Sequence, residues 1–280
     1  MLGTRTEVRA LTPVDLTEFR RVVDADPDVN VFLRHRGDLT RLEPRWLGGQ
    51  VLGFFVDGRL ASVCHCGANV VPGETSPEAI DAFAEVLALS PVRPASIAGP
   101  REAVIQLWDA LEPLWGPARS VRPDQPFLVI DHAPTVAPDL RVRHVVVDEL
   151  ELLYPACVQM FTEEVGVDPE STHGNLYRSR VAQLIAQGWS FAIIEDGQVL
   201  FKAEIGALAP GTCQLQGVWV APELRGTGLA APAVAGVVNL VRDEFASTVS
   251  LYVNRHNERA HRTYLRAGFR QHDTFATVLL

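Results

Sequence analysis

Apolar and polar positions alternate along the 280-residue chain with two different periods, which predict short strands and amphipathic helices in turn. Helical spacing is clear in residues 15–23, where four apolar residues recur on one face. Apolar runs also flank the dipeptides Asp57-Gly58 and Asp196-Gly197, which are typical of tight hairpin turns. After a short strand near residue 7, the predicted strands cover residues 50–56, 59–66, 67–72, 95–98, 125–130, 140–147, 189–195, 198–207, 213–220, 248–253 and 269–280. The predicted helices cover residues 15–23, 30–42, 76–89, 101–115, 149–164, 175–187, 229–244 and 257–267.

The two halves of the chain repeat one order of elements: helices, a hairpin at an Asp-Gly turn, a strand, a helix, a strand, a helix and a last strand. Residues 131–139, which include Pro134 and Pro138, separate the halves as a linker. We therefore expect two tandem domains, residues 1–133 and residues 134–280. Each would have an α/β fold of the mixed-sheet, α+β kind, with a central, mostly antiparallel sheet flanked by helices.

Residues 218–230 predict a phosphate-binding loop. They contain the end of a strand, a turn with Pro222, a glycine loop and the start of a helix rich in Ala and Val. Gly226 and Gly228 leave the backbone bare and permit positive φ. The first amides of the helix point outward beside the positive end of its dipole, so the loop can hold a phosphate. The spacing matches neither the nucleoside-triphosphate loop nor the dinucleotide fingerprint.

Two motifs in the second half point to one family. The loop contains Arg225-x-x-Gly228-x-Ala230, which resembles the pyrophosphate-binding signature of the GNAT superfamily of acetyl-CoA-dependent N-acetyltransferases. An ordinary strand-to-helix turn is the alternative reading of this motif alone. Residues 257–269 follow the pattern Asn-x-x-Ala-x-x-x-Tyr-x-x-x-Gly-Phe, which resembles the helix after the fifth strand in the same superfamily. The order and separation of the two motifs agree with that family, and the resemblance covers about residues 140–280.

The first half departs from this pattern where a cofactor would bind. Residues 73–77, after the strand 67–72, contain a single Gly and no Arg, and Glu74 would repel a pyrophosphate. After the strand 95–98, the Asn and the Tyr of the second motif are both missing. The layout is similar to that of tandem GNAT proteins of actinobacterial type, the mycothiol synthases among them, in which one half is silent. We therefore expect a degenerate GNAT-like domain followed by a catalytic one.

The resemblance implies an acetyl-CoA-dependent N-acetyltransferase that moves an acetyl group to a primary amine by direct attack in a ternary complex. Acetyl-CoA would be a cosubstrate lying in a V between the fourth and fifth strands, and no metal would be needed. The residues that the resemblance assigns to acetyl-CoA are Val218, Trp219, Val220, Arg225, Gly226, Thr227, Gly228, Leu229, Ala230 and Asn257. The alternative function is a non-catalytic acyl-CoA-binding module that acts as a sensor or a scaffold.

Two residues are expected to act in catalysis. Tyr264 would give a proton to the departing thiolate, because a phenol with a pKa of about 10 suits a thiol with a pKa of about 8.5; the alternative is a core tyrosine that anchors its helix. Glu204, a carboxylate in mid-strand, would take the amine proton; the alternative is an ion pair with Lys202 on the same strand face. Polar residues expected on the acceptor side are Gln214, Gln216, Glu163, Glu164 and Asp168.

The composition of the chain limits the kinds of molecule that we expect it to bind. The net charge of −9 argues against nucleic acid or an anionic membrane surface and suits a small-molecule amine or a peptide amine. No apolar run would span a membrane, and the N-terminus lacks a signal-peptide core, so we expect a cytoplasmic protein, either a monomer or a homodimer. Four cysteines are too few for a disulfide framework, and residues 64–66 (Cys-His-Cys) fit a buried strand better than a metal site.

Overall fold

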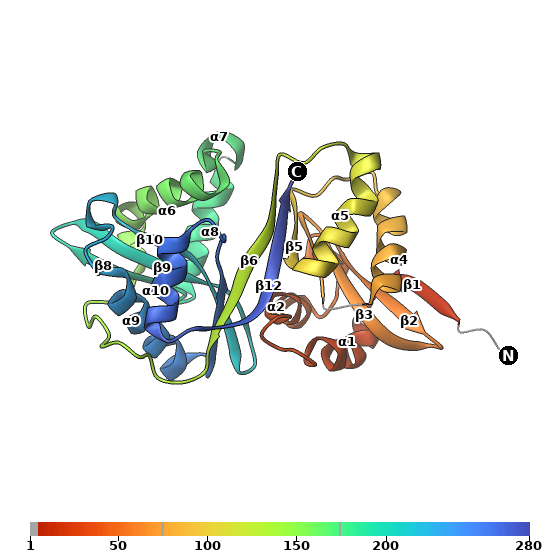
Figure 1. Ribbon diagram of the computed structural model, residues 1–280, viewed down its shortest axis with the longest axis horizontal. Coiled ribbons are helices and arrows are strands. Elements are labelled where there is room, and N and C mark those ends of the chain that lie inside the picture. The colour runs from red at the N-terminus through yellow and green to blue at the C-terminus, as the bar shows by residue number, and fades with distance from the viewer. Residues whose placement is uncertain (1–4, 74–75, 174) are drawn as a thin grey trace. The chain divides into compact units, whose positions relative to one another are not determined.

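The computed structural model describes residues 5–73, 76–173 and 175–280, which form two compact units. Unit 1 comprises Met1–Phe127, Tyr252–Glu258 and Gln271–Leu280, and unit 2 comprises Leu128–Leu251 and Arg259–Arg270. Each unit has a mixed sheet with helices packed on it (Figure 1). The predicted fold class, a mainly antiparallel mixed sheet with helices in each of two domains, is confirmed.

The sheet of unit 1 has one parallel pair of strands. In spatial order its strands are β1 (Thr6–Ala10), β2 (Gln50–Val56), β3 (Arg59–Cys66), β4 (Asn69–Pro72), β5 (Ser96–Pro100) and β12 (Arg270–Leu279). All neighbours pair antiparallel except β4 and β5, which are parallel. A further strand, β6 (Ser120–Ile130), begins in unit 1 and ends in unit 2.

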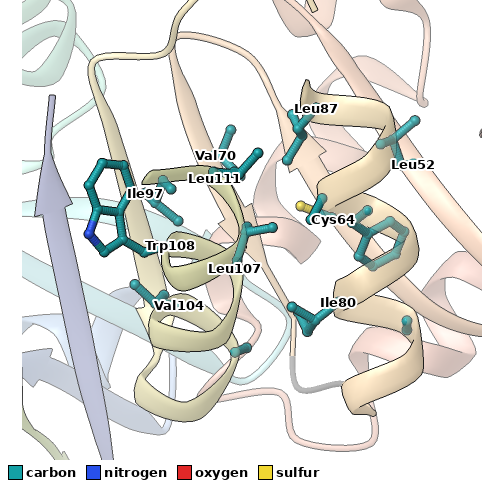
Figure 2. Close-up of a cluster of buried hydrophobic side chains, with 14 of the residues drawn as sticks. Leu52, Cys64, Val70, Ile80, Leu87, Ile97, Val104, Leu107, Trp108 and Leu111 are labelled. Atoms are coloured by element: carbon teal, nitrogen blue, oxygen red, sulfur yellow. The ribbon is translucent and has the colours of Figure 1, made fainter. Parts of the chain in front are cut away.

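Helices cover both faces of this sheet, because successive side chains of a strand point in opposite directions. Leu52 and Phe54 of β2 pack in an apolar cluster with α4 and α5, whereas Val51 and Phe55 pack in a second cluster with α1 and α2. Figure 2 shows the first cluster, in which Cys64 is fully buried as the strand pattern predicts. The helices are α1 (Leu16–Val23), α2 (Val31–Thr40), α3 (Pro44–Leu47), α4 (Pro77–Ala88) and α5 (Arg101–Trp115).

Unit 2 repeats this arrangement. Its strands, in spatial order, are β7 (Arg143–His144), β8 (Ser190–Glu195), β9 (Gln198–Ala209), β10 (Thr212–Val220) and β11 (Thr248–Tyr252). Within the described residues, β10 and β11 pair in parallel, whereas the β7–β8, β8–β9 and β9–β10 pairs are antiparallel. Its helices are α6 (Leu150–Val165), α7 (Pro169–His173), α8 (Asn175–Ala186), α9 (Ala230–Glu244) and α10 (Glu258–Ala267). α6 and α8 pack on β8 through a shared apolar cluster, and Figure 1 shows α9 on the other side of the strands from α6.

Local pattern predicted most of these elements and missed the shortest ones. β2, β3 and α5 have the predicted bounds. α3 and α7 span four and five residues, which is too short for a helical period to be visible in the sequence. Of the predicted strand 140–147, only Arg143–His144 pairs with a neighbour.

The last strand is where the sequence pattern and the fold differ. The pattern assigns residues 269–280 to the second half, whereas β12 pairs antiparallel with β5 in unit 1. Ala276 and Val278 are fully buried in the same cluster as α4 and α5. Alternating apolar residues show that a strand has a buried face, but they do not say which sheet accepts it. A division of the chain into residues 1–133 and 134–280, each folding on its own, therefore stays a prediction.

We predict that Val278→Asp unfolds unit 1 locally. Val278 is 0% exposed, so the substitution buries a charge with no partner at a cost on the order of several kcal/mol. Hydrogen exchange followed by mass spectrometry should show α4 and α5 losing protection while α9 keeps it. Val121→Asp is the matched control, because Val121 lies in β6 and is 43% exposed. Equal loss of protection in α9 would contradict the assignment of β12 to unit 1.

Candidate active site

The candidate site begins where β10 separates from β11. The two strands pair over only three residues of β10, from Thr212↔Thr248 to Gln214↔Ser250, although β10 continues to Val220. The other edge of β10 stays paired with β9 as far as Val220↔Phe201. Since buried backbone groups require partners, the edge of β10 that leaves β11 offers donors and acceptors to a ligand.

A β-bulge lies in the separated part of β10. Gln216 faces Glu204 and Trp219 faces Lys202, so Gly217 and Val218 together oppose one residue of β9. Gly217 has φ +62°, which explains the glycine at this position. A Cβ there would lie 2.9 Å from the Lys202 ammonium nitrogen. The bulge is therefore packed directly against charged side chains of β9.

The glycine loop after β10 has the conformation that the sequence predicts. A short 3₁₀ turn, Pro222–Leu224, leads into Gly226 with φ +87° and Gly228 with φ +96°. A Cβ at either glycine would meet nothing within 4 Å, so the backbone is open to a ligand. Thr227 closes the turn, because its backbone N–H and its hydroxyl both donate to the Leu224 carbonyl (3.3 and 2.8 Å).

Helix α9 starts directly after this loop, with Leu229 as its N-cap. The first amides of a helix have no acceptor within the helix, and Ala230 and Ala231 occupy these positions. Pro232 is the third residue of α9, where its missing N–H costs no helical hydrogen bond. The loop and the helix start together can bind an anion through backbone N–H groups and the helix dipole.

Arg225 is held by groups of unit 2. Its Nε donates to the Val220 carbonyl oxygen at 3.0 Å, and its guanidinium forms an ion pair with Glu163 of α6 at 2.9 Å. Both side chains are partly exposed, so the pair contributes only about 0–1 kcal/mol. A phosphate can therefore replace Glu163 at low cost.

Glu204 and Lys202 form a buried ion pair on β9. Lys202 Nζ donates to Glu204 Oε2 at 3.1 Å and to the Gly217 carbonyl oxygen at 3.0 Å. Glu204 Oε1 accepts a third bond from Gln216 Nε2 at 3.0 Å. Burial alone would lower the pKa of Lys202, but the Glu204 carboxylate and Cys157 raise it above its ordinary value, so the ammonium stays charged. The ion pair foreseen as the alternative role of Glu204 is thus present.

Tyr264 lies buried in α10, at 7% exposure, with its ring packed edge-on against Phe269. Burial and the negative charge of Glu164 raise the pKa of its phenol above the usual value. The group therefore stays protonated at neutral and moderately alkaline pH. A proton donor must be protonated, so this state agrees with the predicted catalytic role. The buried ring agrees equally with the alternative role, a core tyrosine that anchors its helix.

Asn257, whose backbone N–H donates to the Asn254 carbonyl oxygen at 2.8 Å, lies in a segment that belongs to unit 1, whereas residues 218–230 belong to unit 2. Trp219 points into a cluster with Ala156 and Ala221, so only its backbone is available to a cofactor. Cys157 of α6, which helps to raise the pKa of the Lys202 ammonium, is a residue that sequence reasoning treated only as part of the core.

A hollow of about 440 Å³ lies elsewhere in unit 2. It is lined mainly by the first half of α6, the β8–β9 turn and residues 219–223. Of the predicted site residues, Trp219 lines it, whereas residues 225–230, Glu204 and Tyr264 do not. The hollow therefore adjoins the end of β10 but does not contain the glycine loop or the predicted catalytic residues.

The sequence predicts three absences: no pyrophosphate site in the first half, no metal site and no membrane span. Glu74, which was expected to repel a pyrophosphate in the first half, lies outside the described residues. Among residues 5–73, 76–173 and 175–280, no group of three or more His, Cys, Asp or Glu side chains is arranged to hold a metal ion. No helix in the described part of the chain is long and apolar enough to cross a membrane.

Two stretches of the sequence match family models. Residues 166–269 match the acetyltransferase (GNAT) family, and residues 49–153 match a domain of unknown function, DUF4081. No curated protein sequence matches the chain. The GNAT match contains the glycine loop, both strands of the separated pair and Tyr264.

Solved structures share the fold over nearly the whole chain. An acetyltransferase of the GNAT family from Colwellia psychrerythraea has a TM-score of 0.58 at 12% identity, covering 98% of this chain and 99% of that one. A GCN5-related N-acetyltransferase from Sphaerobacter thermophilus has a TM-score of 0.62 at 17% identity, covering 99% and 96%. A tandem GNAT protein from the clavulanic acid biosynthesis pathway has a TM-score of 0.54 at 12% identity, covering 98% of both chains. Identities this low compare the fold alone.

The family match and the geometry agree on residues 166–269, where the separated strands lead into the glycine loop and the start of α9. The second half of the chain therefore contains a domain of the GNAT acetyltransferase family, the family that the two motifs resemble.

Proposed function

We propose that the protein transfers an acetyl group from acetyl-CoA to a primary amine by direct attack in a ternary complex. The observation that carries this proposal is the separation of β10 from β11, which leads directly into a loop with two positive-φ glycines and an open helix start. A strand edge with unpaired groups suits an extended pantetheine arm, and the helix start suits its pyrophosphate.

Different residues of unit 2 would bind different parts of the cofactor. The backbone of residues 218–220 would pair with the pantetheine arm as an added strand does. The pyrophosphate would lie at the amides of residues 226–230, with Arg225 released from Glu163 to pair with it. Freed from Arg225, Glu163 would join Glu164 and Asp168 as acidic groups that favour a cationic acceptor.

The reaction forms a C–N bond and breaks a C–S bond. The neutral amine attacks the thioester carbon, and the collapse of the tetrahedral intermediate expels the CoA thiolate. Tyr264 would give its proton to that sulfur and recover one from solvent. Burial raises the pKa of the phenol, which keeps it protonated but makes full transfer of its proton to the thiolate less favourable, so a hydrogen bond from the hydroxyl to the sulfur is the other form that this help can take.

The attacking nitrogen must also lose a proton. Glu204 is the carboxylate that the sequence offers for this step, directly or through water. Each of its oxygens accepts one hydrogen bond, Oε2 from Lys202 and Oε1 from Gln216, and keeps a second lone pair for a proton. The attraction of the paired ammonium opposes protonation of the carboxylate, which favours the role of counter-charge to Lys202. We expect the protein to meet its acceptor, a small-molecule or peptide amine, in the cytoplasm.

Gly228→Glu should abolish acetyl-CoA binding, because it adds bulk and negative charge to the pyrophosphate loop. Isothermal titration calorimetry should show the loss, while circular dichroism reports an unchanged fold. Gly58→Glu is the matched control: Gly58 also has a positive φ, +81°, and open space around it, but it lies in the β2–β3 turn. If Gly228→Glu binds acetyl-CoA as tightly as the wild type, the assignment of this loop fails.

Calorimetry should also give a stoichiometry of one acetyl-CoA per chain. The segment after β4 in unit 1 lacks the Arg and the second Gly that form the loop after β10. In Gly228→Glu the site in unit 2 is blocked, so any acetyl-CoA that still binds must bind to unit 1. We expect this variant to bind no acetyl-CoA. Two sites of similar affinity in the wild type, or one remaining in the variant, would mean that the first half is not silent.

Tyr264→Phe should lower kcat by roughly 10²–10⁴-fold with little change in acetyl-CoA affinity, since it removes one proton donor and keeps the ring. The wild-type rate should show no loss from ionisation of this phenol below about pH 10, the ordinary value. Tyr154→Phe, which also removes the hydroxyl of a buried tyrosine in unit 2, is the control. A Tyr264→Phe rate within about twofold of the wild type, with chemistry limiting, would make Tyr264 a packing residue.

A further inference from the structure

Lys202 is the only lysine in the chain, which has 25 Lys and Arg residues together. Its side chain is 1% exposed. Buried charges are expensive unless they are paired, and here the ammonium is paired within unit 2 by the Glu204 carboxylate and the Gly217 carbonyl oxygen. An ammonium is a compact group with three donors, whereas a guanidinium is a wide planar fork. The position thus requires a lysine in a protein that otherwise uses arginine.

The Gly217 contact joins this charge to the backbone of the site. Gly217 and Val218 form the bulge of β10, in the part of the strand that has left β11. The Gly217 carbonyl points toward Lys202, at 3.0 Å. In a planar trans peptide the N–H of the next residue points the opposite way, so the Val218 N–H is directed away from Lys202. The ammonium therefore fixes the orientation of the peptide group at which residues 218–220 begin.

We propose that Lys202 is a positioning residue for acyl transfer, which holds the β10 bulge so that residues 218–220 present their backbone groups to the acyl-pantetheine arm. This inference rests on the proposed function. Without the ammonium, the Gly217 carbonyl loses its charged donor, and the bulge can relax toward regular pairing with β9. A slip of one residue would turn the groups of residues 218–220 to the other side of the strand.

Energetics favour a positioning role over a purely stabilising one. A buried ion pair often contributes little net stability compared with apolar side chains of the same size, because both charges lose their hydration. Tyr177 and Cys157 bring α8 and α6 over this pair, since the Tyr177 hydroxyl donates to the Cys157 carbonyl oxygen at 3.0 Å. The groups facing Lys202 are thus Glu204 and Gly217 from the sheet and Cys157 from α6. What the pair secures is one particular backbone conformation.

The test compares Lys202→Met, Glu204→Gln and the double variant. Lys202→Met leaves Glu204 buried without its partner and can fail to fold, whereas the double variant removes both charges and keeps the volume. Glu204→Gln, which keeps the bond from Lys202 to Gly217, is the reference, because it already removes whatever Glu204 contributes as a base. We expect kcat of the double variant to fall a further roughly 10- to 100-fold below that of Glu204→Gln, the scale of a displaced reacting group, with KM for acetyl-CoA changed less than about threefold.

A second measurement needs no turnover. Hydrogen exchange in the absence of ligand should show faster exchange in residues 214–221 of the double variant, with α9 unchanged. If the double variant matches the wild type in both kcat and exchange, or if Glu204→Gln alone loses as much activity as the double variant, Lys202 is no more than a counter-charge and the inference fails. The proposed function is judged separately: it fails if the wild type neither binds acetyl-CoA nor acetylates any amine.

Discussion

The pairing of one strand constrains the rest of the active half. β10 is joined to β9 along its length but to β11 over only three residues. A backbone edge that is neither paired nor filled by a ligand must be solvated, and buried amides without partners are costly. Ser250 closes the paired end, where its hydroxyl donates to the Cys213 carbonyl oxygen at 3.0 Å. Beyond that point the strand carries the bulge, the glycine loop and the start of α9 in that order.

Two ion pairs beside this strand differ in their physical roles. Arg225 and Glu163 are a third or more exposed, so water screens their attraction and an incoming anion can exchange with the carboxylate. Lys202 and Glu204 are buried, where the charges cannot be separated without a large desolvation cost. The first pair suits a contact that changes when a cofactor binds, and the second suits a fixed support. The same residue chemistry therefore serves opposite purposes at different depths.

The last strand of the chain belongs to a sheet that is formed mainly by the first half. β12 comes from the end of the chain, yet its apolar residues are buried in the core of unit 1 beside α4 and α5. Without the first half, Ala276 and Val278 would have no core to enter. The first half of the chain therefore buries a strand that the second half supplies.

The sequence by itself determined the elements, the fold family and the loop that carries the motif. The signals for these features are local: glycines at positions with positive φ, the Asp-Gly hairpins and the Tyr264 motif. Each depends on residues close together in the chain, so each can be recognised from the sequence alone. Only the tertiary structure decided which sheet receives β12 and which group pairs with Glu204. It also decided that Asn257 falls in a segment of unit 1. These outcomes join residues far apart in the chain, or depend on the depth at which a charge is buried. Periodicity carries no information about either, because a strand with one apolar face fits any sheet edge that offers a core.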